Sequence, residues 1–224
     1  MREIVLDTET TGLDPNAGHR VIEIGCIELM NHIPTGVTFH RYINPERAMP
    51  DEAFAVHGLS EAFLAQHPVF AAVAAEFLEF VGDAKLVIHN AAFDIKFLNA
   101  ELERLEHPPI PLARAVDTVQ MARQRFPGAQ ASLDALCRRF EIDNSRRDKH
   151  GALLDAELLS LVYLELIGGR QPGLELAAEI RVVRSTVPAA IRPVRPARPH
   201  APSPEEEAAH AQMIAGLADA IWLR

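Results

Sequence analysis

Two carboxylates stand two residues apart near the start of the chain, where an apolar run ends. The run is Ile4-Val5-Leu6, and Asp7 and Glu9 follow it within the segment LDTETTG. Side chains at positions i and i+2 of a strand point to the same face, so a strand here would aim both acids at one point. Two like charges held together need a cation between them or a raised pKa. The spacing therefore predicts a divalent metal site.

Two later segments place further chemistry where strands or helices end. In HNAAFD we expect a strand to end at His89 and a helix to follow, so that Asp94 falls in its first turn. In HGALLD, Gly151 allows His150 to belong to the preceding loop, from which its ring can swing toward a metal held by Asp155. Oxygen ligands suit Mg²⁺ or Mn²⁺, in sites that hold two ions about 3.5–4 Å apart. The whole set matches what metal-assisted phosphodiester hydrolysis needs.

The elements that must hold these groups follow from the apolar pattern. Short apolar runs predict strands, and apolar residues at helical spacing predict helices. The strands are expected at 3–7, 20–30, 36–43, 85–89 and 114–117, and the helices at 70–81, 91–105, 118–126, 132–140 and 151–167. A meander followed by βα units indicates an α/β or α+β domain with a mixed sheet.

Composition narrows the class of protein. A chain of 224 residues that is 48% hydrophobic fits one folded domain with or without an appendage. Cys26 and Cys137 allow neither a disulfide framework nor a zinc cage, which indicates a reducing, cytoplasmic location, and the chain opens without a leader. A net charge of −9 argues against a protein that holds nucleic acid by bulk electrostatics, but it does not exclude a nuclease.

The C-terminal part has a different composition. Six prolines interleaved with arginines lie between Val187 and Pro204, which predicts a linker. The residues 205–224 begin with three glutamates and carry apolar residues at roughly helical spacing. A short tethered helix cannot bury such a stripe alone, so we expect it to dock on a partner. The alternative is a helix that folds back onto its own domain.

The acidic motifs and their order resemble the DEDDh, or DnaQ-like, family of 3′→5′ exonucleases, and within it the proofreading subunits of bacterial DNA polymerase III. The likeness covers roughly residues 3–168 and returns at the C-terminal EEAAH and tryptophan. It runs through LDTETTG, EAFAVHGLS, VIHNAAFD, SLDALCRRFEIDNS and HGALLDAELL. The resemblance implies a ribonuclease H-like fold, a mixed five-stranded sheet flanked by helices, with a flexible C-terminal tail.

The resemblance also implies roles for the site residues. Asp7, Glu9 and Asp155 would ligate the first of two divalent cations, and Asp7 would also hold the second, with Asp94 assisting through water. His150 would be the general base, a role that the ordinary pKa of histidine suits. The other residues expected to contact substrate, beside these metal ligands, are Thr10, Leu13, Glu52, His57, Leu59 and Phe93. For Leu13, Leu59 and Phe93, plain core packing is the alternative.

The same resemblance divides the chain into three parts and supplies partners. The exonuclease domain would span 1–169, a clamp-binding peptide and Pro/Arg-rich linker 170–204, and a polymerase-docking helix 205–224. The sliding clamp would be bound through Gln171, Leu174 and Leu176, and the polymerase catalytic (alpha) subunit through Leu217, Ile221 and Trp222. DNA 3′ ends would be the substrate. A small theta-like subunit is a further partner in that family, although no motif here establishes it.

Two other functions remain open at this point. A free-standing DEDDh exoribonuclease or oligonucleotidase would share every catalytic residue but would have no need for the tail. A noncatalytic bridge between clamp and polymerase would keep the fold without the activity, yet all five residues expected for chemistry are present.

Overall fold

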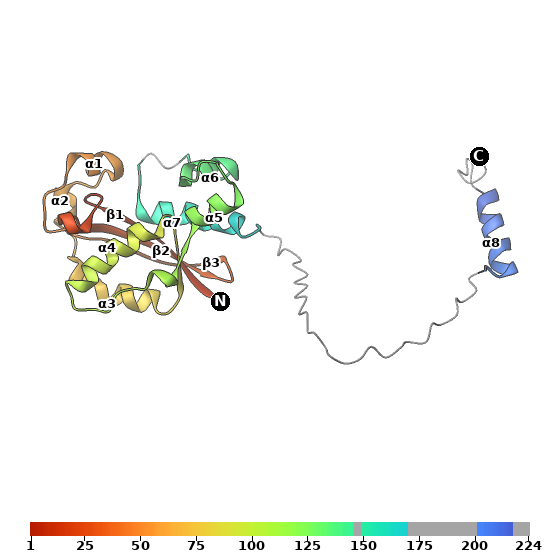
Figure 1. The fold of residues 1–224 in the computed structure, drawn as a ribbon, viewed down its shortest axis with the longest axis horizontal. Helices are drawn as coiled ribbons and strands as arrows, with labels where there is room; N and C mark the ends of the chain where they lie inside the picture. The colour runs from red at the N-terminus through yellow and green to blue at the C-terminus, as the bar shows by residue number, and fades with distance from the viewer. Residues whose placement is uncertain (146–148, 170–200, 217–224) are drawn as a thin grey trace, which may run out of the picture. The chain divides into compact units, whose positions relative to one another are not determined.

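Five strands form one mixed sheet in the first of two units into which the chain divides, Met1–Leu176 and Ala177–Arg224 (Figure 1). A computed structural model describes residues 1–145, 149–169 and 201–216. The order across the sheet is β3-β2-β1-β4-β5. The strand bounds are β1 Arg2–Thr10, β2 Val21–Met30, β3 Ile33–Tyr42, β4 Lys85–Ile88 and β5 Ala115–Asp117.

β1 is the central strand and pairs in both senses. Val5 lies opposite Ile27 of antiparallel β2 and opposite Val87 of parallel β4. A meander that leads into parallel βα units produces this arrangement, and the predicted mixed five-stranded sheet is confirmed.

Alternation along β1 divides the core into two layers. Ile4 and Leu6 pack with α3 (Phe70–Val81) and α4 (Ala91–Glu103), whereas Val5 packs on the opposite face. That second layer holds α5 (Thr118–Arg125), α6 (Leu133–Arg139) and α7 (Ala152–Leu166), and Figure 1 shows the two groups of helices separated by the strands. Both cysteines are buried, as expected of packing residues.

Several elements differ from the sequence expectations. β1 continues to Thr10, beyond the expected end at residue 7, because β2 keeps pairing with it through Glu9 and Thr10. α4 ends at Glu103 rather than at residue 105. Four short elements were not expected: α1 Asp51–His57, α2 Glu61–Leu64, and the 3-10 turns η1 Pro15–Ala17 and η2 Leu112–Arg114. None is long enough to show an apolar period.

The second unit contributes one described helix, α8 (Pro204–Ala215). Ser203 and Glu206 form a reciprocal capping box at its start, and three glutamates occupy its first turn, where the helix dipole favours acids. The residues expected to bind clamp and polymerase, Gln171, Leu174, Leu176, Leu217, Ile221 and Trp222, lie outside the described residues, as does the linker up to residue 200. Within the described segments, no helix combines the length and apolarity needed to span a bilayer.

Candidate active site

The end of β1 supplies groups to both layers of the fold. Asp7 and Glu9 share the face of Val5 and so point to the side of α7, whereas Thr8 points to the side of α4. On that side the Asp94 carboxylate accepts hydrogen bonds from the Thr8 amide at 3.1 Å and the Thr8 hydroxyl at 2.7 Å. Thr8 therefore fixes Asp94 beside the two acids of its own strand.

Asp94 is buried, with 3% of its surface exposed, in the first turn of α4. Burial raises the pKa of Asp94 to about 7; the hydrogen bonds from Thr8 oppose this rise, and the charge of Asp117 adds to it. The charged form of this carboxyl group is therefore unfavourable unless a cation lies nearby.

α7 brings the fourth acid to the same place. A Cβ on Gly25 of β2 would lie 2.3 Å from the Ala152 carbonyl carbon, so the first turn of α7 rests directly on the sheet. Asp155 follows within that turn and is buried. Because Asp7 pairs with Gly25 in register, this contact sets the separation of Asp155 from the acids of β1.

His150 precedes α7 in a loop, as expected, and Gly151 is the extended N-cap residue. The His150 Nδ1 lies 3.2 Å from Asp155 Oδ2, and its side chain is 47% exposed. Ligand atoms of Glu9, His150 and Asp155 all lie within 4.8 Å of one another, which is close enough to share one metal ion.

A cavity of about 310 Å³ joins these groups. All five residues expected to carry the chemistry line it, although they come from three distant stretches of sequence. The full lining is Asp7, Thr8, Glu9, His89, Phe93, Asp94, Ser132, Leu133, Asp134, His150 and Asp155.

A second cavity of about 720 Å³ shares Thr8, Glu9 and Phe93 with the first and has a mainly apolar lining. Five of the six further residues expected to contact substrate line it: Thr10, Leu13, Glu52, His57 and Phe93. Leu13 is 84% exposed. Leu59 lines neither cavity, because it follows the end of α1 and contributes its backbone N–H to His57.

The His57 ring is buried and has a defined tautomer. Its Nδ1 accepts a hydrogen bond from the Leu59 N–H at 3.0 Å, so Nε2 carries the proton of the neutral ring. Nε2 has no hydrogen-bond partner among the described residues. Burial lowers the pKa of His57, Glu23 opposes the shift, and Lys149 and His150 add to it. The second cavity is therefore lined by a neutral histidine with one unused donor.

Sequence reasoning missed two groups that build the site. The alternation of β1 sends Thr8 to the side of α4, which is the signal that could have found it. For Gly25 the signal is its place inside a strand, since a glycine there often marks close backbone approach. His89 and Asp134 also line the smaller cavity, and the His89 Nδ1 lies 2.9 Å from the Thr118 hydroxyl.

The arrangement suits hydrolysis of a phosphodiester. Four carboxylates offer the oxygen ligands that divalent cations prefer, a half-exposed imidazole lies beside them, and a larger apolar cavity adjoins the acids.

The chain is similar to known proteins. The Exonuclease family matches residues 4–163 of the chain. The chain is 55% identical over 188 residues to DNA polymerase III subunit epsilon of Rickettsia conorii, which covers 83% of this chain and 82% of that protein. It is 50% identical over 177 residues to DNA polymerase III subunit epsilon of Escherichia coli K12, covering 75% of this chain and 72% of that protein.

Solved structures share the fold at lower identity. The nuclease domain of 3′hExo, a DEDDh family member bound to rAMP, matches with a TM-score of 0.65 and 19% identity over 74% of this chain and 91% of that chain. The zinc-bound form of the E. coli ExoI–ssDNA complex matches with a TM-score of 0.66 and 19% identity over 77% of this chain and 41% of that chain. The expected ribonuclease H-like fold is confirmed.

Proposed function

Because this chain belongs to the exonuclease family and, within it, to the epsilon subunits of bacterial DNA polymerase III, we propose a role for each group of its site in removing the last nucleotide of a DNA 3′ end. The protein is a metal-dependent proofreading 3′→5′ exonuclease. The observation that carries the residue assignment is the convergence of all five expected groups on one cavity.

The residues present fit divalent cations. Glu9, His150 and Asp155 place ligand atoms within 4.8 Å of one another, and the raised pKa of Asp94 marks a place where added positive charge is favourable. We assign Asp7, Glu9 and Asp155 to a first ion, and Asp7, with Asp94 acting through water, to a second. Mg²⁺ or Mn²⁺ suits these oxygen ligands. Two such ions, when bound, stabilise the attacking and leaving oxygens of an in-line displacement.

His150 acts as the general base. Its Nδ1 lies 3.2 Å from Asp155 Oδ2, which favours the proton on Nδ1 and leaves Nε2 to accept a proton from water. The side chain is 47% exposed, so water reaches it.

The larger cavity receives the terminal nucleotide. We assign His57 and Glu52, both on α1, to bind the nucleotide. The His57 Nε2 has no hydrogen-bond partner among the described residues, and the carboxylate of Glu52 is exposed. Leu13 and Phe93 provide the apolar surface for the base, with Thr10 at the side. A mismatched end costs less to unstack than a paired one, so it reaches this cavity more often. Selectivity then comes from melting rather than from reading the base.

The tail connects the nuclease to its assembly. Gln171, Leu174 and Leu176 bind the sliding clamp, and residues 205–224 bind the polymerase catalytic subunit through Leu217, Ile221 and Trp222. This assignment divides the chain into 1–169, 170–204 and 205–224. Tethering raises the local concentration of the nuclease at the primer end, so an acidic domain with modest affinity for DNA suffices. We further propose that the protein binds a small theta-like subunit and that it acts in the cytoplasm.

Hydrolysis of a labelled primer tests the site. The full chain with Mg²⁺ or Mn²⁺ should release nucleoside 5′-monophosphates from single-stranded and mismatched 3′ ends faster than from matched ends. Replacing both Asp7 and Glu9 with alanine should abolish release at every metal concentration. Activity that survives this double substitution would show that the site lies elsewhere.

A further inference from the structure

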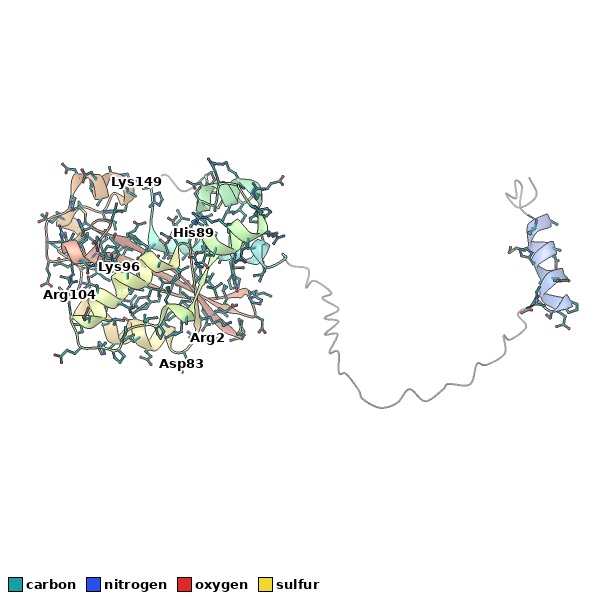
Figure 2. The ribbon with its side chains drawn as sticks, in the orientation of Figure 1. Arg2, Asp83, His89, Lys96, Arg104 and Lys149 are labelled. Carbon is teal, nitrogen blue, oxygen red and sulfur yellow. The ribbon has the colours of Figure 1, made fainter. Side chains whose placement is uncertain are left out.

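The residue before the general base contacts the helix that is proposed to hold the substrate. Lys149 and His150 precede α7, whereas α1 (Asp51–His57) carries Glu52 and His57. Figure 2 shows Lys149 at the edge of the domain beside α1. The two segments are about ninety residues apart in the chain, so their contact is a feature of the fold rather than of local sequence.

Three contacts join the two segments. The His150 N–H donates to the Val56 carbonyl at 3.3 Å. The Lys149 Nζ lies over the Phe54 ring, 5.1 Å from its centroid. A Cβ on Gly58 would lie 2.6 Å from the Lys149 Cδ, so the lysine stem lies directly on the end of α1.

The left-handed conformation of Gly58 and its lack of a side chain allow this contact. Its φ is +73°, and its N–H closes α1 by donating to the Phe54 carbonyl. Glycine adopts this left-handed conformation without strain, and its missing side chain leaves the room that the lysine stem fills. The aliphatic stem therefore packs on backbone while the ammonium reaches the aromatic face, as amphipathic lysine side chains do.

We propose that Lys149 is a positioning residue that fastens the loop of the general base His150 to the substrate-binding helix α1. This inference rests on the proposed function of His150 and of α1. The Lys149 contacts with Phe54 and Gly58 add to the backbone hydrogen bond from His150 to Val56, and together they hold this part of the loop against α1. Seating of the nucleotide on α1 and placement of the base then depend on each other.

The consequence for catalysis is a loss of rate rather than of binding. Lys149 is exposed, so removing it leaves the buried core untouched. However, the loop that carries His150 loses its side-chain contact with α1. A small displacement of a catalytic group can lower kcat. A cation–π contact at an exposed site contributes about 0.5–1 kcal/mol, so we expect kcat to fall about 2- to 5-fold.

Four variants of the full chain test the contact on single-stranded DNA. Lys149→Ala removes the ammonium and stem, and Lys149→Arg keeps a cation that can lie over the ring. Phe54→Leu keeps apolar bulk and removes the aromatic face, and the fourth variant combines Lys149→Ala with Phe54→Leu. Lys85→Ala is the matched control, because Lys85 is an exposed lysine at the far start of β4.

We expect Lys149→Ala and Phe54→Leu each to lower kcat about 2- to 5-fold, with KM changed less than about twofold. Lys149→Arg should restore at least half of the lost rate, and the double variant should be no slower than the slower single variant. Thermal unfolding of each variant within a few degrees of the parent and of Lys85→Ala would show that folding is intact.

Additive losses in the double variant would overturn the inference, as would unchanged kcat in Lys149→Ala or an effect confined to KM. His150→Ala, measured in parallel, separates this failure from that of the proposed function. If His150→Ala keeps the parent rate, the base assignment itself fails. If His150→Ala is inactive while the Lys149 and Phe54 variants are normal, the assignment stands and only the fastening role is lost.

Discussion

Gly25 of β2 lies against the backbone of Ala152 at the start of α7, so closely that a Cβ on Gly25 would be 2.3 Å from the Ala152 carbonyl carbon. Gly25 also pairs in register with Asp7. One glycine thus sets the distance between the acids of the central strand and Asp155 of the helix.

Gly25→Ala should therefore impair metal binding more than it impairs folding. The added methyl group must push the first turn of α7 away from the sheet, because backbone atoms cannot rotate aside. We expect a loss of about 1–3 kcal/mol in the free energy of unfolding from overpacking. Displacement of Asp155 should lower kcat/KM about 10-fold or more. Calorimetric titration with Mn²⁺ measures the loss of metal affinity, and urea unfolding measures the loss of stability.

Ile27→Val in the same strand is the control for stability alone. Ile27 is buried in the core layer of α7, and its shortening should cost about 0.5–1.5 kcal/mol. This variant should keep the metal affinity of the parent. Parent-like Mn²⁺ affinity in Gly25→Ala would contradict the role assigned to the glycine.

Asp94 predicts a pH dependence of stability in protein stripped of metal. Its pKa in the folded protein, about 7, lies above the ordinary value of 3.8. Its contribution to stability is thus complete below about pH 3.8 and is lost as the pH rises through 7. Asp94→Asn keeps an oxygen that accepts from Thr8 and carries no charge to desolvate. In EDTA, the variant should be more stable than the parent at pH 8, and the difference should shrink at pH 5.

Asp83→Asn controls for charge removal in general. Asp83 is an exposed carboxylate, and Figure 2 shows it at the opposite edge of the domain from Lys149. Its variant should follow the parent at both pH values in thermal unfolding. If the stability difference between Asp94→Asn and the parent is the same at pH 5 and pH 8, burial does not raise the pKa of Asp94.

The parts of the site that follow from the alternation of a single strand could be predicted from the sequence. Asp7 and Glu9 at i and i+2 required a shared face, and the structure has it. Asp94 is expected in the first turn of the helix that follows a strand ending at His89, and it lies there.

Contacts that depend on a second element could not be derived in this way. The ends of α1 carry ordinary helix signals, acids in its first turn and Gly58 after its last residue, but seven residues are too few to show which face binds substrate. Glu52 and His57 came only from the family resemblance. Nothing in the sequence around Lys149 predicts its partner. Its contact with Phe54 depends on two segments that meet only in the folded domain.

His57 should contribute to nucleotide binding through its Nε2 proton. His57→Ala removes the donor and should raise the dissociation constant of a nucleoside 5′-monophosphate about 2- to 10-fold, the range of one neutral hydrogen bond. His67→Ala is the control, because His67 packs with Tyr42 and Phe63 and does not line either cavity. Equal affinities of the parent and His57→Ala would remove His57 from the substrate site. Fluorescence titration in the presence of Mn²⁺ gives these constants.

The tail should be separable from the chemistry. The groups that line both cavities belong to residues 7–155, so deleting residues 205–224 removes none of them. We expect the truncated protein to hydrolyse single-stranded DNA at the parent rate but to lose copurification with the polymerase catalytic subunit. Replacing Gln171 and Leu174 with alanine should instead weaken binding to the sliding clamp and leave polymerase binding unchanged. Joint loss of hydrolysis and polymerase binding in the truncated protein would mean that α8 and the residues after it support the nuclease domain itself.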